Sequence, residues 1–341
     1  MKFDFAIGNP PYQEETKNNG RQSPVYNKFM DEAFKVADCV ELITPARFLF
    51  NAGQTPKAWN DKMLNDEHFK VLQYEPDASK VFSNTEIKGG VAITIRDDIK
   101  SYGAIKVFTS HQELNHIIKK VVEVIGQEEC LDSIISSRGC YRTTDVFFQD
   151  FPYALERLGI GTGNMIASNF FEKMPEVYLD SKPNDEYLGI LSRVNNKRTI
   201  CYLKKIYVRD NEFIGKYNVA FPKSNGNGVF GEVLTSTEIV PPNEGATDTF
   251  INIGAFETQY EAESMTKYIK TKFLRALLGT KKVTQDNPKG VWNMIPLQDF
   301  TNKSDIDWQT SITGIDKQLY KKYRLSDEEI NFIETHVKEM E

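Results

Sequence analysis

The stretch Phe3-Asp4-Phe5-Ala6-Ile7-Gly8 runs directly into Asn9-Pro10-Pro11-Tyr12 at the start of the sequence. The first run is apolar and rich in strand-forming residues, so it predicts a buried β-strand. The two prolines fix the backbone after it and offer no N–H, which leaves carbonyl oxygens free to accept hydrogen bonds. In open α/β sheets ligands bind at the carboxyl ends of strands. We therefore expect residues 9–12, the Asn-Pro-Pro-Tyr corner, to form an active site.

The corner suits a target that carries an NH2 group on a flat ring. Asn9 Oδ1 and the Pro10 carbonyl oxygen could each accept one amino proton, while the Tyr12 ring stacks on the target. Hydrogen bonds to both amino protons would withdraw them from conjugation with the ring. The nitrogen lone pair then becomes more nucleophilic, which is what an alkyl-transfer reaction at this nitrogen needs.

On these residues the sequence resembles a known family. Asn9-Pro10-Pro11-Tyr12 is similar to the catalytic motif of amino-group methyltransferases that use S-adenosylmethionine, above all the N6-adenine DNA methyltransferases. The resemblance implies that Asn9, Pro10 and Tyr12 act on an adenine extruded from the duplex. It also implies a double-stranded DNA substrate in a restriction-modification system.

The following segments predict strands and helices in the order of an α/β protein. Strands are predicted at 3–8, 40–45, 69–74 and 91–96, with a helix opening at Ser23-Pro24 and a second at 56–64. This order resembles the C-terminal half of a Rossmann-like methyltransferase sheet, whose closing hairpin contains its one antiparallel strand. We expect this catalytic half at residues 1–104 and a mixed α+β target-recognition domain at 105–341.

The resemblance supplies a second stacking residue. In restriction-associated adenine methyltransferases an aromatic side chain between the last two strands closes the other face of the flipped base, and Phe82 stands in the matching place. An ordinary core phenylalanine at a strand end is the alternative.

The cofactor half of the family pattern lies outside this sequence. The family binds S-adenosylmethionine through a glycine-containing loop and an acidic strand end, both upstream of the corner, and Asn9 has almost nothing before it. The glycine-rich run at 159–163 follows a helical stretch rather than a strand, so we interpret it as a flexible turn. We expect the chain to be inactive alone and to bind an N-terminal methyltransferase half, or to self-associate, through the exposed edge of strand 3–7.

A metal-dependent nuclease is a weaker alternative in the same region. Asp77 followed by Glu86-Ile87-Lys88 has the loose form of a nuclease signature, in which two carboxylates hold magnesium and a lysine assists water. The four cysteines are scattered and lack nearby histidine partners. We expect no metal site and reduced thiols.

Composition favours a two-domain globular protein. The chain has 341 residues, 40% of them apolar, and a net charge of −6. No apolar run reaches the ~18 to 20 residues that span a bilayer, and no leader pattern opens the sequence, so we expect a cytoplasmic protein without membrane contact.

The net charge disfavours nucleic acid as a partner, but acidic residues concentrate after residue 305. We expect DNA phosphate contacts from the basic pairs Lys197-Arg198, Lys204-Lys205 and Lys281-Lys282.

Residues after 105 mix short strands with capped helices. Capping boxes are predicted at Ser110, Thr258 and Ser326, and the second opens a helix expected to run to residue 278 with a solvated basic side. Short strands are predicted at 199–208, 217–222 and 249–253.

Two functional hypotheses follow. The first is the base-flipping and target-recognition part of an adenine-specific methyltransferase, and the aromatic pair Tyr12 and Phe82 favours it. The second is a non-catalytic DNA-recognition or assembly subunit descended from such an enzyme. Glutamine and RNA methyltransferases share the corner motif, but the long region after residue 104 disfavours them.

Overall fold

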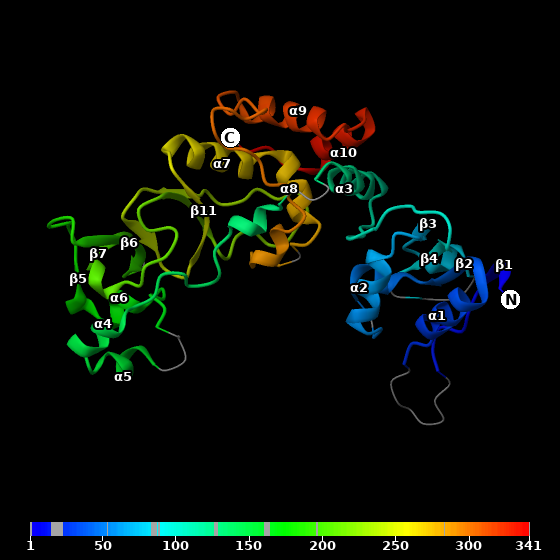
Figure 1. The fold of residues 1–341 in the computed structure, drawn as a ribbon, viewed down its shortest axis with the longest axis horizontal. Coiled ribbons are helices and arrows are strands. Elements are labelled where there is room, and N and C mark those ends of the chain that lie inside the picture. Colours follow the sequence, from blue (N-terminus) through cyan, green and yellow to red (C-terminus); the bar gives the residue numbers. More distant parts are fainter. Residues whose placement is uncertain are drawn as a thin grey trace. The chain divides into compact units, whose positions relative to one another are not determined.

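The computed structural model describes residues 2–340 except 15–22, 53, 83–86, 88, 126–128, 160–163, 196 and 283. The chain is divided into two compact units, Met1–Lys120 and Val121–Glu341. The boundary falls inside helix α3 (Gln112–Ile125), later than the expected boundary at residue 104. Figure 1 colours the first unit blue to cyan and the rest of the chain through green to red.

The first unit contains one four-stranded sheet in the order β1-β2-β4-β3. Its strands are β1 (Phe3–Gly8), β2 (Ala37–Pro45), β3 (Phe69–Glu75) and β4 (Val91–Asp97). β1 runs parallel to β2, and β4 runs antiparallel to both of its neighbours. All four predicted strands are therefore confirmed, together with an antiparallel strand in the closing hairpin.

Helices cover one face of this sheet. The helical segments are α1 (Tyr26–Val36), η1 (Ala46–Phe50), α2 (Lys57–Asn65) and η2 (Ala78–Lys80). The core on this face includes the buried residues Met30, Phe48, Trp59 and Phe69. These residues bury the even-numbered side of β2, which carries Val40 and Leu42.

The opposite face of the sheet is open at β1. Phe3, Phe5 and Ile7 are 70%, 70% and 79% exposed, and they point to this face together because residues alternate sides along a strand. On the same face, the β2 residues Cys39 and Ile43 and the β4 residues Ile93 and Ile95 are only half-buried. Sheets with parallel strands are ordinarily covered on both faces, but in the part of the chain that the structure describes the face around β1 is an exposed apolar surface.

Helix α1 begins later than predicted. It starts at Tyr26 with Val25 at the cap position, and no side chain caps it. Pro24 instead forms an antiparallel bridge with Gln13. Ser23 and Pro24 are therefore part of the return from the Asn-Pro-Pro-Tyr corner rather than the first turn of the helix.

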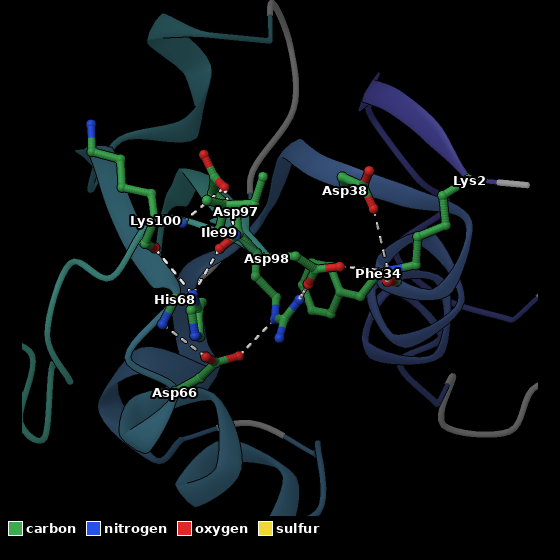
Figure 2. A network of polar contacts seen from close by, with 10 residues as sticks. Lys2, Phe34, Asp38, Asp66, His68, Asp97, Asp98, Ile99 and Lys100 are labelled. Carbon is green, nitrogen blue, oxygen red and sulfur yellow. Dashed lines mark hydrogen bonds and ion pairs between the residues drawn. The ribbon is translucent and has the colours of Figure 1, made fainter.

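A charged network joins the ends of the four strands that lie opposite the corner (Figure 2). Lys2 Nζ donates to Asp98 Oδ2 at 2.5 Å and lies 3.7 Å from Asp38 Oδ1, which ties the start of β1 to β2 and to the end of β4. Arg96 donates to Asp98 and, through Nε at 2.7 Å, to Asp66 Oδ2. Hydrogen bonds from Lys2 and Arg96 hold the pKa of Asp98 below its ordinary value.

We predict that Arg96→Met lowers the free energy of unfolding by about 1–3 kcal/mol, the cost of losing charged hydrogen bonds at partly buried sites. The methionine preserves packing over the Phe34 ring, which lies 5.2 Å from the guanidinium carbon. Urea unfolding followed by circular dichroism measures the change. Lys35→Met is the control, because Lys35 and its partner Glu32 are 66% and 69% exposed and such pairs contribute about 0–1 kcal/mol. Equal stability of the two variants would contradict a role for this network.

The second unit contains two sheets. The first has the order β10-β6-β7-β5 and the second the order β11-β8-β9. The strands are β5 (Tyr178–Leu179), β6 (Tyr187–Val194), β7 (Lys197–Lys204), β8 (Tyr217–Pro222), β9 (Glu238–Val240), β10 (Glu244–Ala246) and β11 (Phe250–Phe256). Phe250, Ala220 and Ala246 form a small core with Leu191 packed against it, which joins the two sheets.

Short helices surround the first of these sheets, and longer ones follow the second. The α-helices are α4 (Asp145–Asp150), α5 (Ala154–Leu158), α6 (Phe170–Lys173), α7 (Gln259–Lys270), α8 (Lys272–Gly279), α9 (Ile312–Lys322) and α10 (Asp327–His336). The 3-10 helices are η3 (Leu131–Ile134), η5 (Pro175–Val177), η6 (Lys205–Tyr207) and η7 (Lys289–Trp292). In the described part of the chain no helix is both long enough and apolar enough to cross a bilayer.

The structure tests the predicted helix starts after residue 105. The boxes at Thr258 and Ser326 are present, each with reciprocal hydrogen bonds to the third helical residue. Helix α3 begins at Gln112, and at its start Thr109 exchanges backbone bonds of 2.7 and 2.9 Å with the Asn115 side chain. The helix predicted from Thr258 to residue 278 is two helices, because Thr271 is extended and caps α8.

Candidate functional site

The Asn-Pro-Pro-Tyr corner lies at the carboxyl end of the edge strand β1. Gly8, the last residue of the strand, pairs with Leu42 of β2, and the exposed Asn9 follows directly. The Tyr12 carbonyl oxygen accepts the Val25 N–H at 3.1 Å, just before helix α1 begins. The corner is therefore held at one end by the sheet and at the other by the entrance to α1.

Tyr12 is positioned by packing rather than by its hydroxyl group. The ring packs against the core of the first unit, and burial raises the pKa of the phenol to about 12. Its hydroxyl oxygen is buried, and no hydrogen-bond partner is found among the described residues. The side chain is neutral at ordinary pH and offers a ring face.

The structure brings Tyr12 and Phe82 together. The ring centroids are 6.4 Å apart and the ring planes meet at 70°, an edge-to-face contact. A base stacked between two parallel rings would need about two 3.4 Å spacings, or roughly 7 Å. The two rings therefore touch each other, and one of them must rotate before a base fits between them.

Phe82 follows a short capped turn. Asp77 Oδ1 accepts hydrogen bonds from Ser79 N at 3.1 Å and Ser79 Oγ at 2.6 Å, which hold the pKa of Asp77 below its ordinary value. The Phe82 N–H then donates to the Ala78 carbonyl oxygen at 2.9 Å. Asp77 thus has a capping role that places Phe82.

The geometry of the nuclease pattern can be followed only at Asp77. Glu86 and Lys88, the other two residues of that pattern, lie outside the described residues. Within the described ranges no group of three or more His, Cys, Asp or Glu side chains could hold a metal ion.

The neighbouring end of β2 contributes features that the sequence reasoning did not identify. The Thr44 side chain is completely buried, and its hydroxyl has no partner among the residues described. Arg47 is exposed just after the strand, and its stem packs so closely on Gly89 that a Cβ there would lie 2.6 Å from Arg47 Cγ. Gly90, at φ +74°, lies against the Glu75 carbonyl and has no room for a Cβ. The proline that ends the strand beside β1 is the signal in the sequence that could have identified this edge.

The glycine-rich run at 159–163 lies mostly outside the described residues. Gly159 has a φ of 84° and follows helix α5, and residues 160–163 lie outside the described part. A glycine turn after a helix lacks the strand-to-helix context of a nucleotide-type cofactor loop.

The basic pairs on β7 lie at the surface of the second unit. Lys197 and Arg198 are exposed at the start of β7. The Arg198 guanidinium donates to Glu238 at 2.7 Å and lies 5.6 Å from the Phe250 ring centroid. Lys204 is exposed at the end of the strand, and Lys205 is half-buried at the start of η6.

The third basic pair differs from the expectation of phosphate contacts. Lys281 Nζ donates to Asn293 Oδ1 at 2.6 Å. The Lys282 side chain is only 3% exposed, and its ammonium donates to Glu232 at 2.5 Å and to the Thr284 carbonyl oxygen at 3.0 Å. Because this ammonium is buried and paired, it cannot reach a phosphate without breaking a buried ion pair. We therefore leave Lys282 out of the candidate DNA interface.

The basic side predicted for residues 258–278 is also largely occupied. Lys267 donates to the Trp308 carbonyl oxygen at 2.6 Å, and Lys272 donates to Glu334 at 2.5 Å. Arg275 is 2% exposed and donates to backbone carbonyl oxygens. These cations hold the helices together rather than forming a solvated surface.

We predict that Lys282→Met lowers the free energy of unfolding by about 3–5 kcal/mol, because it leaves the Glu232 carboxylate buried without its cation. Thermal or urea unfolding measures this. The double variant Lys282→Met and Glu232→Gln should recover part of the loss, since no charge remains unpaired. A Lys282→Met protein with unchanged stability would contradict this structural role.

Two sequence comparisons match parts of this chain, and the first covers the corner. Residues 1–82 match the family model described as Eco57I restriction-modification methylase. A protein of Mycoplasma pneumoniae described as an uncharacterized adenine-specific methylase is 30% identical over 99 residues, which cover 28% of this chain. The match spans 24% of that relative, about a quarter of its length.

Two solved structures resemble the chain distantly. The type IIG restriction endonuclease BpuSI superposes with a TM-score of 0.30 and 10% identity over 94% of this chain and 50% of that chain. The ATP-dependent type ISP restriction-modification enzyme LlaBIII, bound to DNA, superposes with a TM-score of 0.23 and 10% identity over 98% and 29%.

Proposed function

We propose that this chain is the base-binding and target-recognition part of an enzyme that methylates the N6 amine of adenine in a specific DNA sequence. The observation that carries the proposal is the Asn-Pro-Pro-Tyr corner at the carboxyl end of β1, with Phe82 against Tyr12. The match of residues 1–82 to a restriction-modification methylase model supports it. We also propose that the enzyme belongs to a restriction-modification system and acts in the cytoplasm.

Asn9 and Pro10 would prepare the amine for methyl transfer. Asn9 is exposed at the end of the strand, and its Oδ1 would accept one amino proton while the Pro10 carbonyl oxygen accepts the other. When nitrogen attacks, it gains positive charge, and both acceptors bind its protons more strongly. S-adenosylmethionine would supply the methyl group as an activated sulfonium. The corner itself supplies the acceptors and the orientation.

Tyr12 and Phe82 would hold the extruded base. Stacking on an aromatic ring contributes about 1–3 kcal/mol per base, enough to offset part of the cost of unstacking it from the duplex. Tyr12 is fixed by the core, whereas Phe82 lies at the end of a short turn, so Phe82 is the ring that we expect to rotate.

The open face of the first unit suits a complementary cofactor-binding part. Phe3, Phe5 and Ile7 present apolar surface. β1 is the edge strand of the described sheet, and a further strand would pair with its outer backbone groups. We propose that the glycine-loop half of the methyltransferase pairs with this edge, as another segment or another polypeptide. Self-association through the same edge is the alternative.

The second unit would contact double-stranded DNA. Lys197, Arg198, Lys204 and Lys205 lie on or beside β7, where the first three are exposed. Phosphate contacts from such side chains position the duplex and supply affinity without reading its sequence. Lys281, which follows helix α8, is the remaining residue of the proposed DNA interface.

We predict that Asn9→Ala, in the enzyme assembled with its cofactor-binding part, lowers the rate of methyl transfer by roughly 100- to 1,000-fold. This is the usual effect of removing one group that acts where charge develops. Single-turnover transfer of labelled methyl groups measures the rate, and fluorescence anisotropy measures DNA affinity, which should change less than about threefold.

Tyr12→Phe is the matched control for a change at the corner. Because the Tyr12 hydroxyl has no partner among the described residues, phenylalanine should retain both the packing and the stacking face. Equal losses of DNA affinity and rate in Asn9→Ala would remove Asn9 from the catalytic role.

A further inference from the structure

A polar cavity lies where the two sheets of the second unit meet. Its volume is about 450 Å³, and strands β6, β7 and β8 and the approach to β11 all line it. Four basic residues contribute to the lining, namely Arg138, Arg193, Arg198 and Lys223. Of these, the sequence reasoning had selected Arg198 alone.

Arg138 is held in place by a buried carboxylate. Asp248 is 9% exposed, and its Oδ2 accepts from Arg138 Nη2 at 3.0 Å and Nε at 3.3 Å. The other oxygen of Asp248 accepts the Ser168 N–H at 2.9 Å. Both oxygens of the Asp248 carboxylate therefore have partners. The Arg138 side chain is 62% exposed, and its guanidinium has further N–H groups that can donate to a ligand.

Two other cations at the cavity have no counter-charge. Within the described residues, neither the Arg193 guanidinium nor the Lys223 ammonium has an ion-pair or hydrogen-bond partner. The backbone of Lys223 is fixed, since its N–H donates to Thr249 O at 2.8 Å and its carbonyl accepts Asn287 N at 2.9 Å. Among the described lining residues, Asp286 is the only carboxylate besides Asp248, so the charges of these residues are positive on balance.

A buried hydroxyl in the cavity wall also lacks a partner. Ser192 is 1% exposed, and its Oγ finds no hydrogen-bond partner in the part of the chain that the structure describes. The two unpaired cations, Arg193 and Lys223, thus indicate an anionic ligand.

We propose that this cavity binds a backbone phosphate of DNA. The proposal rests on the DNA-recognition function above and assigns the place of contact. Pro222 and Phe250 give the cavity an apolar wall suited to a deoxyribose, which a free phosphate would not use. Arg193, Lys223 and Arg138 surround the phosphate, and because it carries no base identity, the cavity adds affinity rather than sequence discrimination.

The test compares two double variants of the full chain. Arg193→Gln with Lys223→Gln removes the two unpaired cations. Lys303→Gln with Lys317→Gln removes the same charge from exposed side chains outside the cavity. Anisotropy with a labelled DNA duplex at several salt concentrations gives the slope of log K against log salt, and thermal unfolding checks that each variant is folded.

The cavity variant should flatten the salt slope by roughly one, the value for one phosphate contact, and weaken binding at low salt by about tenfold or more, while the control keeps the slope of the unaltered chain. An unchanged slope in the cavity variant, with DNA bound normally, would overturn this proposal and leave the proposed function standing. Failure of the unaltered chain to bind any DNA would overturn both. Calorimetry with inorganic phosphate distinguishes a DNA phosphate from a free small anion. The cavity is assigned to a small anion instead if the unaltered chain binds phosphate saturably at micromolar concentration, the cavity variant loses this binding, and the DNA salt slope does not change.

Discussion

The parallel pairing of β1 with β2 is the interaction on which the candidate site depends. It aligns Gly8 with Leu42, and so it decides where Asn9 and the following prolines leave the sheet. A slip of one residue would turn the strand over and send Asn9 to the opposite face. The Lys2 contacts with Asp38 and Asp98 hold the other end of β1 against such a slip. Since the side chains of β1 are largely exposed, backbone pairing and this ion pair do most of the work of placing the corner.

The same strand explains why the first unit has an open apolar face. A strand that carries two phenylalanines and an isoleucine outward is costly at a free surface and ordinary inside a covered sheet. The corner and the open face are therefore two consequences of one strand. In the proposed enzyme, a further strand would pair with the edge of β1, and a layer packed over Phe3, Phe5 and Ile7 would cover the open face.

Local patterns predicted the elements well, and contacts distant in sequence determined what they missed. The four strands of the first unit and the boxes at Thr258 and Ser326 follow from periodicity and from residues three apart. The break at Thr271 depends in part on Asp316, whose carboxylate accepts the N–H groups of Lys272 and Phe273 from more than 40 residues away. The burial of Lys282 depends on Glu232, 50 residues earlier. No local pattern contains these partners, so basic residues that look exposed in the sequence are paired inside the fold.

The most direct test of the central claim is the identity of the methylated product. Cells that produce this chain together with its cofactor-binding part, and matched cells with the Asn9→Ala chain, would supply DNA for nuclease digestion and mass spectrometry of nucleosides. Our account predicts N6-methyladenine, confined to one sequence context, in the first DNA and not in the second. Methylation of cytosine, or adenine methylation that persists at the same level without Asn9, would contradict it.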